Sequence, residues 1–280
     1  MRTISASQVS RAVAELCVRA CYDLPRDVEQ AIERAAAAEE SALGRDVLAE
    51  LLDNARIART EGYPVCQDTG FAAVFAEVGQ ELQVTDGSLT DAIQEGIRRG
   101  YEEGYLRKSI VRHPLDRVNT GDNTPSVIHY DIVPGDRLRL TVAPKGAGSE
   151  NMSAVAMLKP SDGVEGVKRF VVETVKAAGA NPCPPIVVGV GLGGTMEKAA
   201  LLAKEALLRE LGRESENPID AALESELLEL INRTGIGPSG YGGRVTALAV
   251  NVESHPCHIA SLPVAVNIQC HAARHAEVTL

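Results

Sequence analysis

The chain has 280 residues, of which 45% are hydrophobic, so it can bury a substantial core without dividing into separate domains. Its 38 Asp and Glu outnumber its 28 Lys and Arg, and the net charge of −10 argues against a nucleic-acid-binding surface. Only 3% of the residues are aromatic and none is Trp, which removes the stacking surfaces that single-stranded nucleic acids use.

Residues 5–60 predict helices, because apolar residues recur at helical spacing over two stretches. They are Val9, Val13, Leu16 and Ala20, followed by Leu43, Val47, Leu48 and Leu51. Residues 1–24 contain no uninterrupted apolar region, so they do not predict a signal peptide. No run approaches the length of a transmembrane helix, so we expect no membrane association. We therefore expect a protein of the reducing cytoplasm, in which the six cysteines do not form a disulfide scaffold.

Helices and strands are mixed beyond the break at Gly62-Tyr63-Pro64. We expect strands at 71–78, 186–190, 245–252 and 264–268, and helices at 88–105, 164–178, 195–211 and 218–233. Alternating polarity in 127–133 and 138–142, around Pro134-Gly135-Asp136, predicts a β-hairpin. Because no repeat or long linker interrupts the chain, we expect a single α+β domain over residues 1–280. It would have a helical N-terminal layer, residues 1–62, followed by a mixed α/β part with a sheet, residues 63–280.

Three cysteines, Cys66, Cys183 and Cys270, stand beside turn-forming residues or at the end of an alternating run rather than inside helices. Three scattered cysteines can converge on one iron–sulfur cluster. Because a fully cysteine-ligated cubane uses four thiolates, three would leave one iron open as a Lewis acid. Burial of a small packed thiol is the alternative for any single cysteine. We expect that alternative for Cys17 and Cys21, which are four residues apart on one amphipathic helix.

The segment Gly189–Gly194 satisfies the dinucleotide-binding pattern GxGxxG, between a predicted strand and a predicted helix. That fingerprint also requires an acidic residue at the end of the next strand, and the helix here leads into another helix instead. We therefore expect no nicotinamide cofactor. We expect the glycines to allow close packing of the strand and helix that support Cys183.

Six segments of the chain occur in the order found in one enzyme family. They are Pro64–Gly70 (PVCQDTG), Asn119–Asn123 (NTGDN), Lys145–Asn151 (KGAGSEN), Asn181–Pro185 (NPCPP), Gly235–Pro238 (GIGP) and the tail from His258 through Cys270 to His275. Together they resemble the class I, iron–sulfur-dependent fumarate hydratases, specifically the α subunit of the two-subunit form. The resemblance runs from about Leu43 to the last residue. No segment resembles the Gly-Pro-Thr-Thr element of the β region, so the resemblance implies a separate β subunit, in an α2β2 assembly.

This resemblance implies that Cys66, Cys183 and Cys270 hold a [4Fe-4S] cluster with one iron not bound by cysteine. That iron would take a substrate carboxylate and hydroxyl in the reversible hydration of fumarate to (S)-malate. The resemblance assigns Asp68 to proton transfer, together with a threonine of the β subunit, because the metal handles only the hydroxyl. A turn-forming role before Thr69 and Gly70 is the alternative for Asp68.

The substrate implied by the resemblance is a small dicarboxylate. Its expected contacts are Gln67, Arg107, Gly146, Ala147, Gly148 and His258. A guanidinium can hold a carboxylate through two hydrogen bonds, although most arginines are simply solvated. The backbone N–H groups of the 146–148 loop could face a carboxylate. The family usually has three glycines in this loop, and Ala147 departs from that pattern.

Two other functions stay open at this point. The α subunit of L(+)-tartrate dehydratase shares the cluster and the chemistry, and the choice between substrates depends on side chains that this chain does not contain. The segments Gly242–Ala247 and Gln269–Ala276 look fumarase-like. A non-catalytic metal-binding assembly protein, with cysteines holding zinc, is the other alternative. Zinc sites usually have paired ligands at CxxC-type spacing, and the chain has no such pair.

Overall fold

The structure is a computed structural model that describes residues 2–280, and it divides the chain into two compact units. Unit 1 comprises the residues up to Leu24, Ala55–Ala147 and Arg274–Leu280, whereas unit 2 comprises Pro25–Asn54 and Gly148–Ala273. Each unit therefore combines segments that are distant in the sequence. Both contain a sheet with parallel and antiparallel pairs together with helices, which confirms the α+β class.

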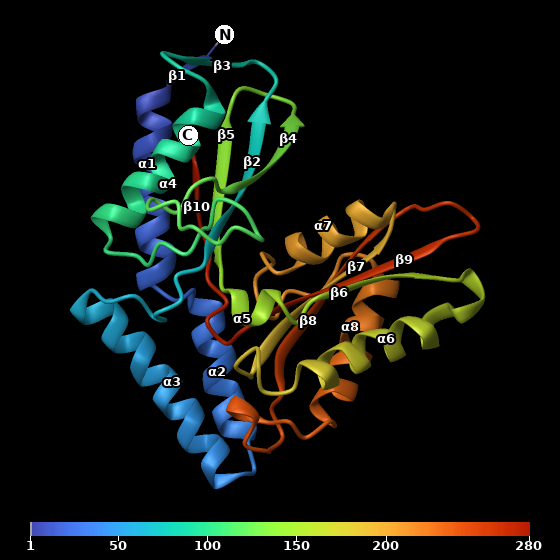
Figure 1. Ribbon diagram of the computed structural model, residues 1–280. Coiled ribbons are helices and arrows are strands. Elements are labelled where there is room, and N and C mark those ends of the chain that lie inside the picture. The colour runs from blue at the N-terminus through green and yellow to red at the C-terminus, as the bar shows by residue number, and fades with distance from the viewer. Residues whose placement is uncertain (1) are drawn as a thin grey trace. The chain divides into compact units, whose positions relative to one another are not determined.

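Unit 1 contains a four-stranded sheet with two helices packed against it (Figure 1). In spatial order the strands are β10 (Ala276–Thr279), β5 (Leu138–Lys145), β2 (Phe71–Gly79) and β4 (Val127–Val133). β5 is antiparallel to both of its neighbours, whereas β4 is parallel to β2. The helices are α1 (Ala6–Tyr22) and α4 (Leu89–Glu103). A separate parallel pair is formed by β1 (Arg2–Ser5) and β3 (Leu82–Thr85).

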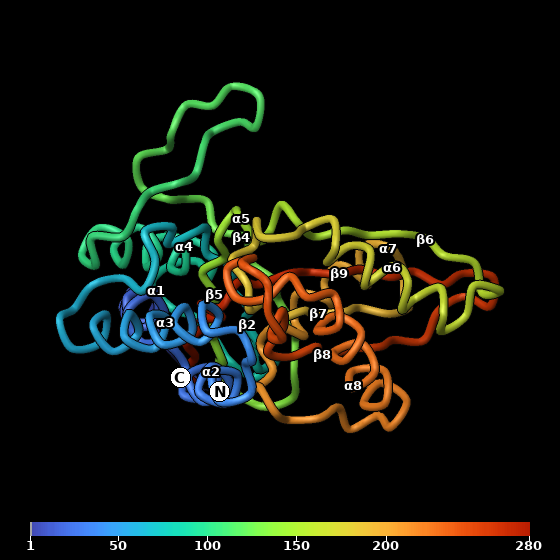
Figure 2. The backbone as a smooth tube through the Cα atoms, turned by 90° about the horizontal axis from the view of Figure 1, so that it is seen from below, coloured from blue at the N-terminus to red at the C-terminus, as the bar shows by residue number. Residues whose placement is uncertain are grey.

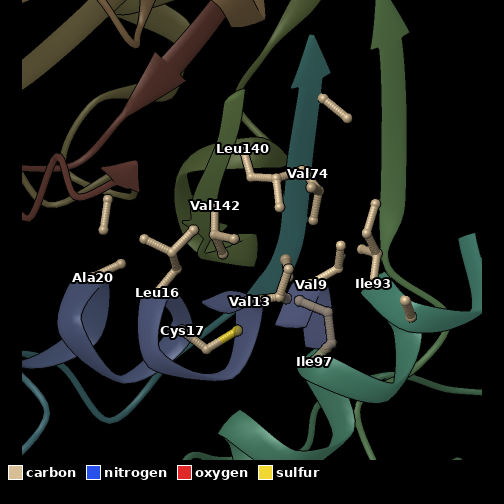
Figure 3. Packing of buried hydrophobic residues seen from close by; sticks show 14 of the residues in the cluster. Val9, Val13, Leu16, Cys17, Ala20, Val74, Ile93, Ile97, Leu140 and Val142 are labelled. Atoms are coloured by element: carbon tan, nitrogen blue, oxygen red, sulfur yellow. The ribbon is translucent and has the colours of Figure 1, made fainter. Parts of the chain in front are cut away.

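The core of unit 1 lies between these two helices and the sheet (Figure 3). α1 begins at Ser5, whose hydroxyl and backbone form a capping box with Gln8. The predicted apolar face of α1 is buried, as are the apolar residues of α4 and of the central strands. The buried residues labelled in Figure 3 include Val9, Val13, Leu16, Cys17, Ala20, Ile93, Ile97, Val74, Leu140 and Val142.

The hairpin predicted for 127–133 and 138–142 is wrong, although both strands exist. β2 lies between β4 and β5 and pairs with each of them. The turn at 134–137 passes around the end of β2, where Gly79 donates its N–H to the Arg137 carbonyl at 2.8 Å. A side chain at Gly79 would meet the Gly135 carbonyl at 2.5 Å, so glycine is required for this passage.

Unit 2 contains a second four-stranded sheet, with helices against both of its faces (Figure 1). In spatial order its strands are β6 (Ala154–Leu158), β9 (Leu262–Gln269), β7 (Ile186–Gly193) and β8 (Ala247–His255). β7 and β8 are parallel, and β9 is antiparallel to both β7 and β6. The helices are α2 (Arg26–Ala38), α6 (Gly163–Ala178), α7 (Met196–Ala206) and α8 (Pro218–Asn232), with 3-10 turns at Pro160–Asp162 and Pro238–Gly240.

The two faces of β7 are packed differently. Val188 and Val190 join the core formed with α6 and α8. The alternate residues Gly189 and Gly191 are so close to α7 that a Cβ atom would lie 2.0 Å and 1.9 Å from its carbonyl oxygens. This confirms the expected close packing of strand and helix. The helix α7 leads into α8, as expected, and the next strand, β8, carries an acid near its end, Glu253, whose carboxylate is bonded to the Arg209 guanidinium at 3.0 Å.

The predicted N-terminal helices are present, but they are divided between the units. α1 belongs to unit 1 and α2 to unit 2, whereas α3 (Ala42–Glu61) crosses the boundary at Asn54–Ala55. The short helix α5 (Ala147–Glu150) crosses it again. None of the helices within residues 2–280 combines the length and the apolarity needed to span a membrane.

Candidate functional site

The loop that contains Cys66 lies in unit 1, immediately before β2, and leaves Cys66 half-buried. Val65 donates its N–H to the Cys21 carbonyl of α1 at 2.8 Å, and the buried hydroxyl of Tyr101 donates to the Thr69 carbonyl at 2.8 Å. Gly70 has a φ of +68°, and a side chain there would lie 2.3 Å from a backbone oxygen at the end of β5. The strand ends therefore fix the conformation of this loop.

The carboxylate of Asp68 is held by two backbone N–H groups. Gly70 donates to Oδ1 at 3.0 Å and Ala147 donates to Oδ2 at 3.1 Å. The first bond closes a turn, which is the alternative role that the sequence suggested for Asp68. The second bond joins Asp68 to Ala147. Ala147 was expected to direct its N–H toward substrate, but here it donates to Asp68. Gly146 allows this approach, because a Cβ at that position would lie only 3.2 Å from Oδ2.

Arg107 lies beside the same loop, because its carbonyl accepts a hydrogen bond from the Thr69 hydroxyl at 3.1 Å. Its side chain is exposed, as is that of Gln67. Arg107 lies near the start of a long connection between α4 and β4, drawn in green in Figure 2. Asn123 closes this connection by donating to the Gly70 carbonyl at 3.2 Å and accepting from the Ser109 N–H at 2.6 Å. The motif 119–123 thus supports the Cys66 loop.

Arg274 is a residue of this site that the sequence analysis did not single out. Its side chain is buried, and its guanidinium donates to the Asp68 carbonyl. A buried arginine is unusual, and it stands here directly after the apolar pair Ala272 and Ala273. That local contrast in polarity is the only signal of its role in the sequence.

In unit 2, Cys183 occupies an exposed turn between α6 and β7. Its φ of +55° places it in the left-handed region, which costs energy for a residue with a side chain. The Cys183 N–H donates to the Ala180 carbonyl at 3.0 Å, and the Cys183 carbonyl lies 3.1 Å from Nδ1 of His271. Strain of this kind persists where the surrounding structure imposes it, and it is concentrated at functional sites.

Cys270 follows β9 and lies at the same end of the unit 2 strands as Cys183. β9 is antiparallel to β7 with Gln269 opposite Val187, so the end of β9 meets the start of β7. The contact of His271 with Cys183 joins the two turns directly. The structure thus brings together two of the three cysteines that the sequence selected.

A second loop of unit 2, residues 234–246, supports the Cys183 turn. Ser239 donates its N–H to the Pro184 carbonyl at 2.8 Å. The far end of this loop is held by the buried carboxylate of Glu39, which accepts from the N–H groups of Arg244 at 2.9 Å and Val245 at 2.8 Å. Burial alone would raise the pKa of Glu39, but its backbone N–H donors outweigh burial and lower the pKa.

His258 lies at the opposite end of the unit 2 sheet. It belongs to the turn between β8 and β9, next to the exposed Cys257. Because β9 spans eight residues, His258 and Cys270 are separated by the length of that strand, about 23 Å. The structure therefore does not bring His258 together with Cys183 and Cys270 within one chain.

Cys17 and Cys21 are packed thiols, as expected from the sequence. Cys17 and Cys21 are fully buried in the core of unit 1. Burial raises the pKa of both thiols, that of Cys21 to about 11, which keeps them protonated. Within residues 2–280, no three His, Cys, Asp or Glu side chains form a group that could hold a metal ion.

The sequence matches the family described as Fumarate hydratase (Fumerase) over residues 10–279. The chain belongs to this family. A relative in Methanocaldococcus jannaschii, provisionally named L(+)-tartrate dehydratase subunit alpha, is 46% identical over 275 residues, which are 96% of each chain. The L(+)-tartrate dehydratase subunit alpha of Escherichia coli (strain K12) is 34% identical over 283 residues, covering 98% of this chain and 93% of the relative. Membership of the family confirms the resemblance found in the sequence motifs.

Proposed function

We propose that this chain is the α subunit of an iron–sulfur hydro-lyase, and that it takes part in the reversible hydration of fumarate to (S)-malate. The family supports the hydro-lyase reaction, and the relatives, which are named as alpha subunits, support a partner subunit that completes the site. We propose an α2β2 assembly with a small dicarboxylate as substrate. We also propose that the protein works in the reducing cytoplasm.

We propose that Cys66 of unit 1 and Cys183 and Cys270 of unit 2 hold a [4Fe-4S] cluster. The observation that carries this proposal is the left-handed conformation of Cys183 in an exposed turn. The carbonyl of Cys183 contacts His271, the residue next to Cys270. The donor set fits the group, because all three thiols lie on loops and none is fully buried. When bound, the cluster would supply one iron without a cysteine ligand as a Lewis acid for the substrate hydroxyl.

The chain's own residues would bind substrate and move a proton. We propose that Asp68 takes part in proton transfer at C3, with a group from the partner subunit. Its two N–H donors would hold the carboxylate in one orientation. Arg107 and Gln67, both exposed beside Asp68, would bind a substrate carboxylate. The loop of Gly146 and Gly148 would contribute backbone N–H groups to the same carboxylate.

The geometry changes the proposal for His258. Because His258 lies the length of β9 away from Cys270, we propose that it contacts substrate in the site of a second copy of the chain. Co-expression of an Asp68→Asn chain with a His258→Ala chain should then restore activity that neither variant has in isolation. Activity no higher than that of the single variants would remove His258 from the site.

The cluster proposal is tested by iron content and visible absorbance after anaerobic purification and reconstitution. Cys66→Ser, Cys183→Ser and Cys270→Ser should each lose the cluster absorbance. Cys257→Ser is the matched control, because Cys257 is exposed like Cys183, and it should bind iron like the wild type. Wild-type iron content in Cys183→Ser would contradict the assignment. Asp68→Asn should keep the cluster and lower kcat by about 10²–10⁴-fold in the assembled enzyme.

Dehydration of L(+)-tartrate is a second candidate reaction, favoured by the names of the relatives. (S)-Malate and L(+)-tartrate differ by one hydroxyl. A site built to hydrogen-bond that hydroxyl discriminates strongly against the substrate that lacks it. The assembled enzyme should therefore be assayed with (S)-malate, fumarate and L(+)-tartrate under the same conditions. A much higher kcat/KM with L(+)-tartrate would replace the fumarate proposal and leave the hydro-lyase proposal standing.

A further inference from the structure

Strand β4 lies at the edge of the unit 1 sheet, with β2 as its neighbour and no strand on its other side within the described residues (Figure 1). An edge strand presents backbone N–H and C=O groups that can pair with another strand. β4 is also apolar and exposed: Ile132 is 71% exposed, Val127 47% and Tyr130 42%. Proteins usually blunt or cover such an edge, so this strand requires an explanation.

The sequence of β4, Val-Ile-His-Tyr-Asp-Ile-Val, is self-complementary when it is read in the opposite direction. An antiparallel pair centred on Tyr130 sets Val127 opposite Val133 and Ile128 opposite Ile132. It also sets His129 opposite Asp131. Each pair is one that stabilises neighbouring strands, either apolar with apolar or a potential cation with a carboxylate.

Other registers of the same pairing lose this match. Centring the pair on Asp131 sets two carboxylates directly opposite each other, which is destabilising. Centring it on His129 sets Val127 opposite Asp131, an apolar side chain against a carboxylate. A shift by one residue moves each side chain to the opposite face of the sheet. The sequence of β4 therefore favours a second copy of itself, in one register.

We propose that β4 pairs with β4 of a second copy of this chain, antiparallel and centred on Tyr130, so that the two four-stranded sheets become continuous across a two-fold axis. Such a contact is isologous and closed, so it yields a dimer rather than a filament. A side chain on each face of β4 is held in place by a neighbour within the chain, which favours ordered pairing. His129 is held in place by stacking on Phe75, with the ring centroids 5.0 Å apart, and Tyr130 is held by a 2.8 Å hydrogen bond to Thr90. This proposal does not depend on the cluster or on the substrate.

Cross-linking tests the register. In the proposed pair the two copies of residue 130 face each other with Cβ atoms about 4.5–5.5 Å apart, whereas the two copies of residue 132 are four residues apart along the strands. A short bis-maleimide should therefore give a covalent dimer of Tyr130→Cys. Ile132→Cys, on the same face and more exposed, is the matched control and should not exceed the wild type, whose Cys183 and Cys257 set the background. Equal cross-linking of both variants would overturn the register.

Sedimentation equilibrium tests the dimer itself. The wild-type chain should sediment with twice the mass of one chain, and Ile132→Lys should weaken the dimer by at least about 30-fold, the loss expected when a buried apolar contact of an interface is replaced by a charge. Val155→Lys is the control, because Val155 is a 47% exposed residue on β6, the edge strand of the other sheet, and it should leave the dimer intact. A monomeric wild type, or an Ile132→Lys dimer of unchanged affinity, would refute the proposal. Circular dichroism confirms that each variant folds.

Discussion

Glu39 should be one of the most costly side chains to remove from unit 2. It is 3% exposed, and its carboxylate accepts hydrogen bonds from the backbone N–H groups of Glu40, Ser41, Arg244 and Val245, each at 2.8–2.9 Å. Replacement by Ala deletes all of these acceptors together. The N–H groups of residues 244 and 245 then lose their partner within a tightly packed loop, because Gly243 lies directly against Glu39.

The cost can be worked out from these bonds. A hydrogen bond to a charged group contributes about 1.5–3 kcal/mol, and a buried donor left without a partner costs about 1–3 kcal/mol. Water can reach the N–H groups of the exposed residues Glu40 and Arg244. We therefore count only the N–H groups of Ser41 and Val245 as uncompensated. Glu39→Ala should therefore lower the free energy of unfolding by about 3–6 kcal/mol, a large share of the about 5–15 kcal/mol typical of a domain.

Urea unfolding followed by circular dichroism measures this loss, and hydrogen exchange should show faster exchange of the Arg244 and Val245 amides. Glu40→Ala is the matched control, because its side chain is 76% exposed and pairs with Arg244 at 2.9 Å, so it should cost under about 1 kcal/mol. The lowered pKa of Glu39 means that its stabilisation is present above the ordinary carboxyl value of 4.5 and is lost as pH falls through the lower, folded value. The difference between wild type and Glu39→Ala should thus shrink in acid. Equal stability of the two variants would refute the reasoning.

Two further outcomes follow from packing. Gly191→Ala should destabilise unit 2 by about 3 kcal/mol in thermal unfolding, because its Cβ would force α7 away from β7. Gly148→Ala, whose Cβ would meet its nearest neighbour at 3.6 Å, should change stability by less than about 0.5 kcal/mol. Cys17 and Cys21, whose pKa values are raised by burial, should resist alkylation in the folded chain while the exposed Cys257 reacts, as mass spectrometry can show. Comparable labelling of Cys21 and Cys257 would contradict their burial.

The sequence predicted the long amphipathic helices and the apolar central strands, because each contains several periods of its pattern. Thus α1, α4, α6 and α8 begin within one residue of their expected positions. The strands β1, β3, β6 and β10 span only four or five residues, too few for a period of two to be recognised, and were not predicted. The turn at 134–137 has the composition of a hairpin, but pairing with β2 decides where both strands lie.

The sequence indicates a loop where its motif is local, and it does not indicate the distant side chains that support the loop. Cys66 and Asp68 stand within one short motif, and their loop is where it was expected. Tyr101, Glu39 and Arg274 act by bonding the backbone of loops that are remote in sequence, and such bonds leave no motif. The boundary between the units was also invisible, because the chain crosses it inside α3 and α5, where no change of composition or linker occurs.

Because the proposed ligands are divided between the units, their supports should act separately. Tyr101 bonds the loop of Cys66 in unit 1, whereas Glu39 holds the loop that bonds the turn of Cys183 in unit 2. Tyr101→Phe removes one hydrogen bond, worth about 0.5–1.5 kcal/mol, and should speed the alkylation of Cys66 in the cluster-free chain while leaving Cys183 unchanged. Glu39→Ala should have the opposite effect, with faster reaction at Cys183 alone. Labelling that rises equally at both cysteines in either variant would show that the two supports are not independent.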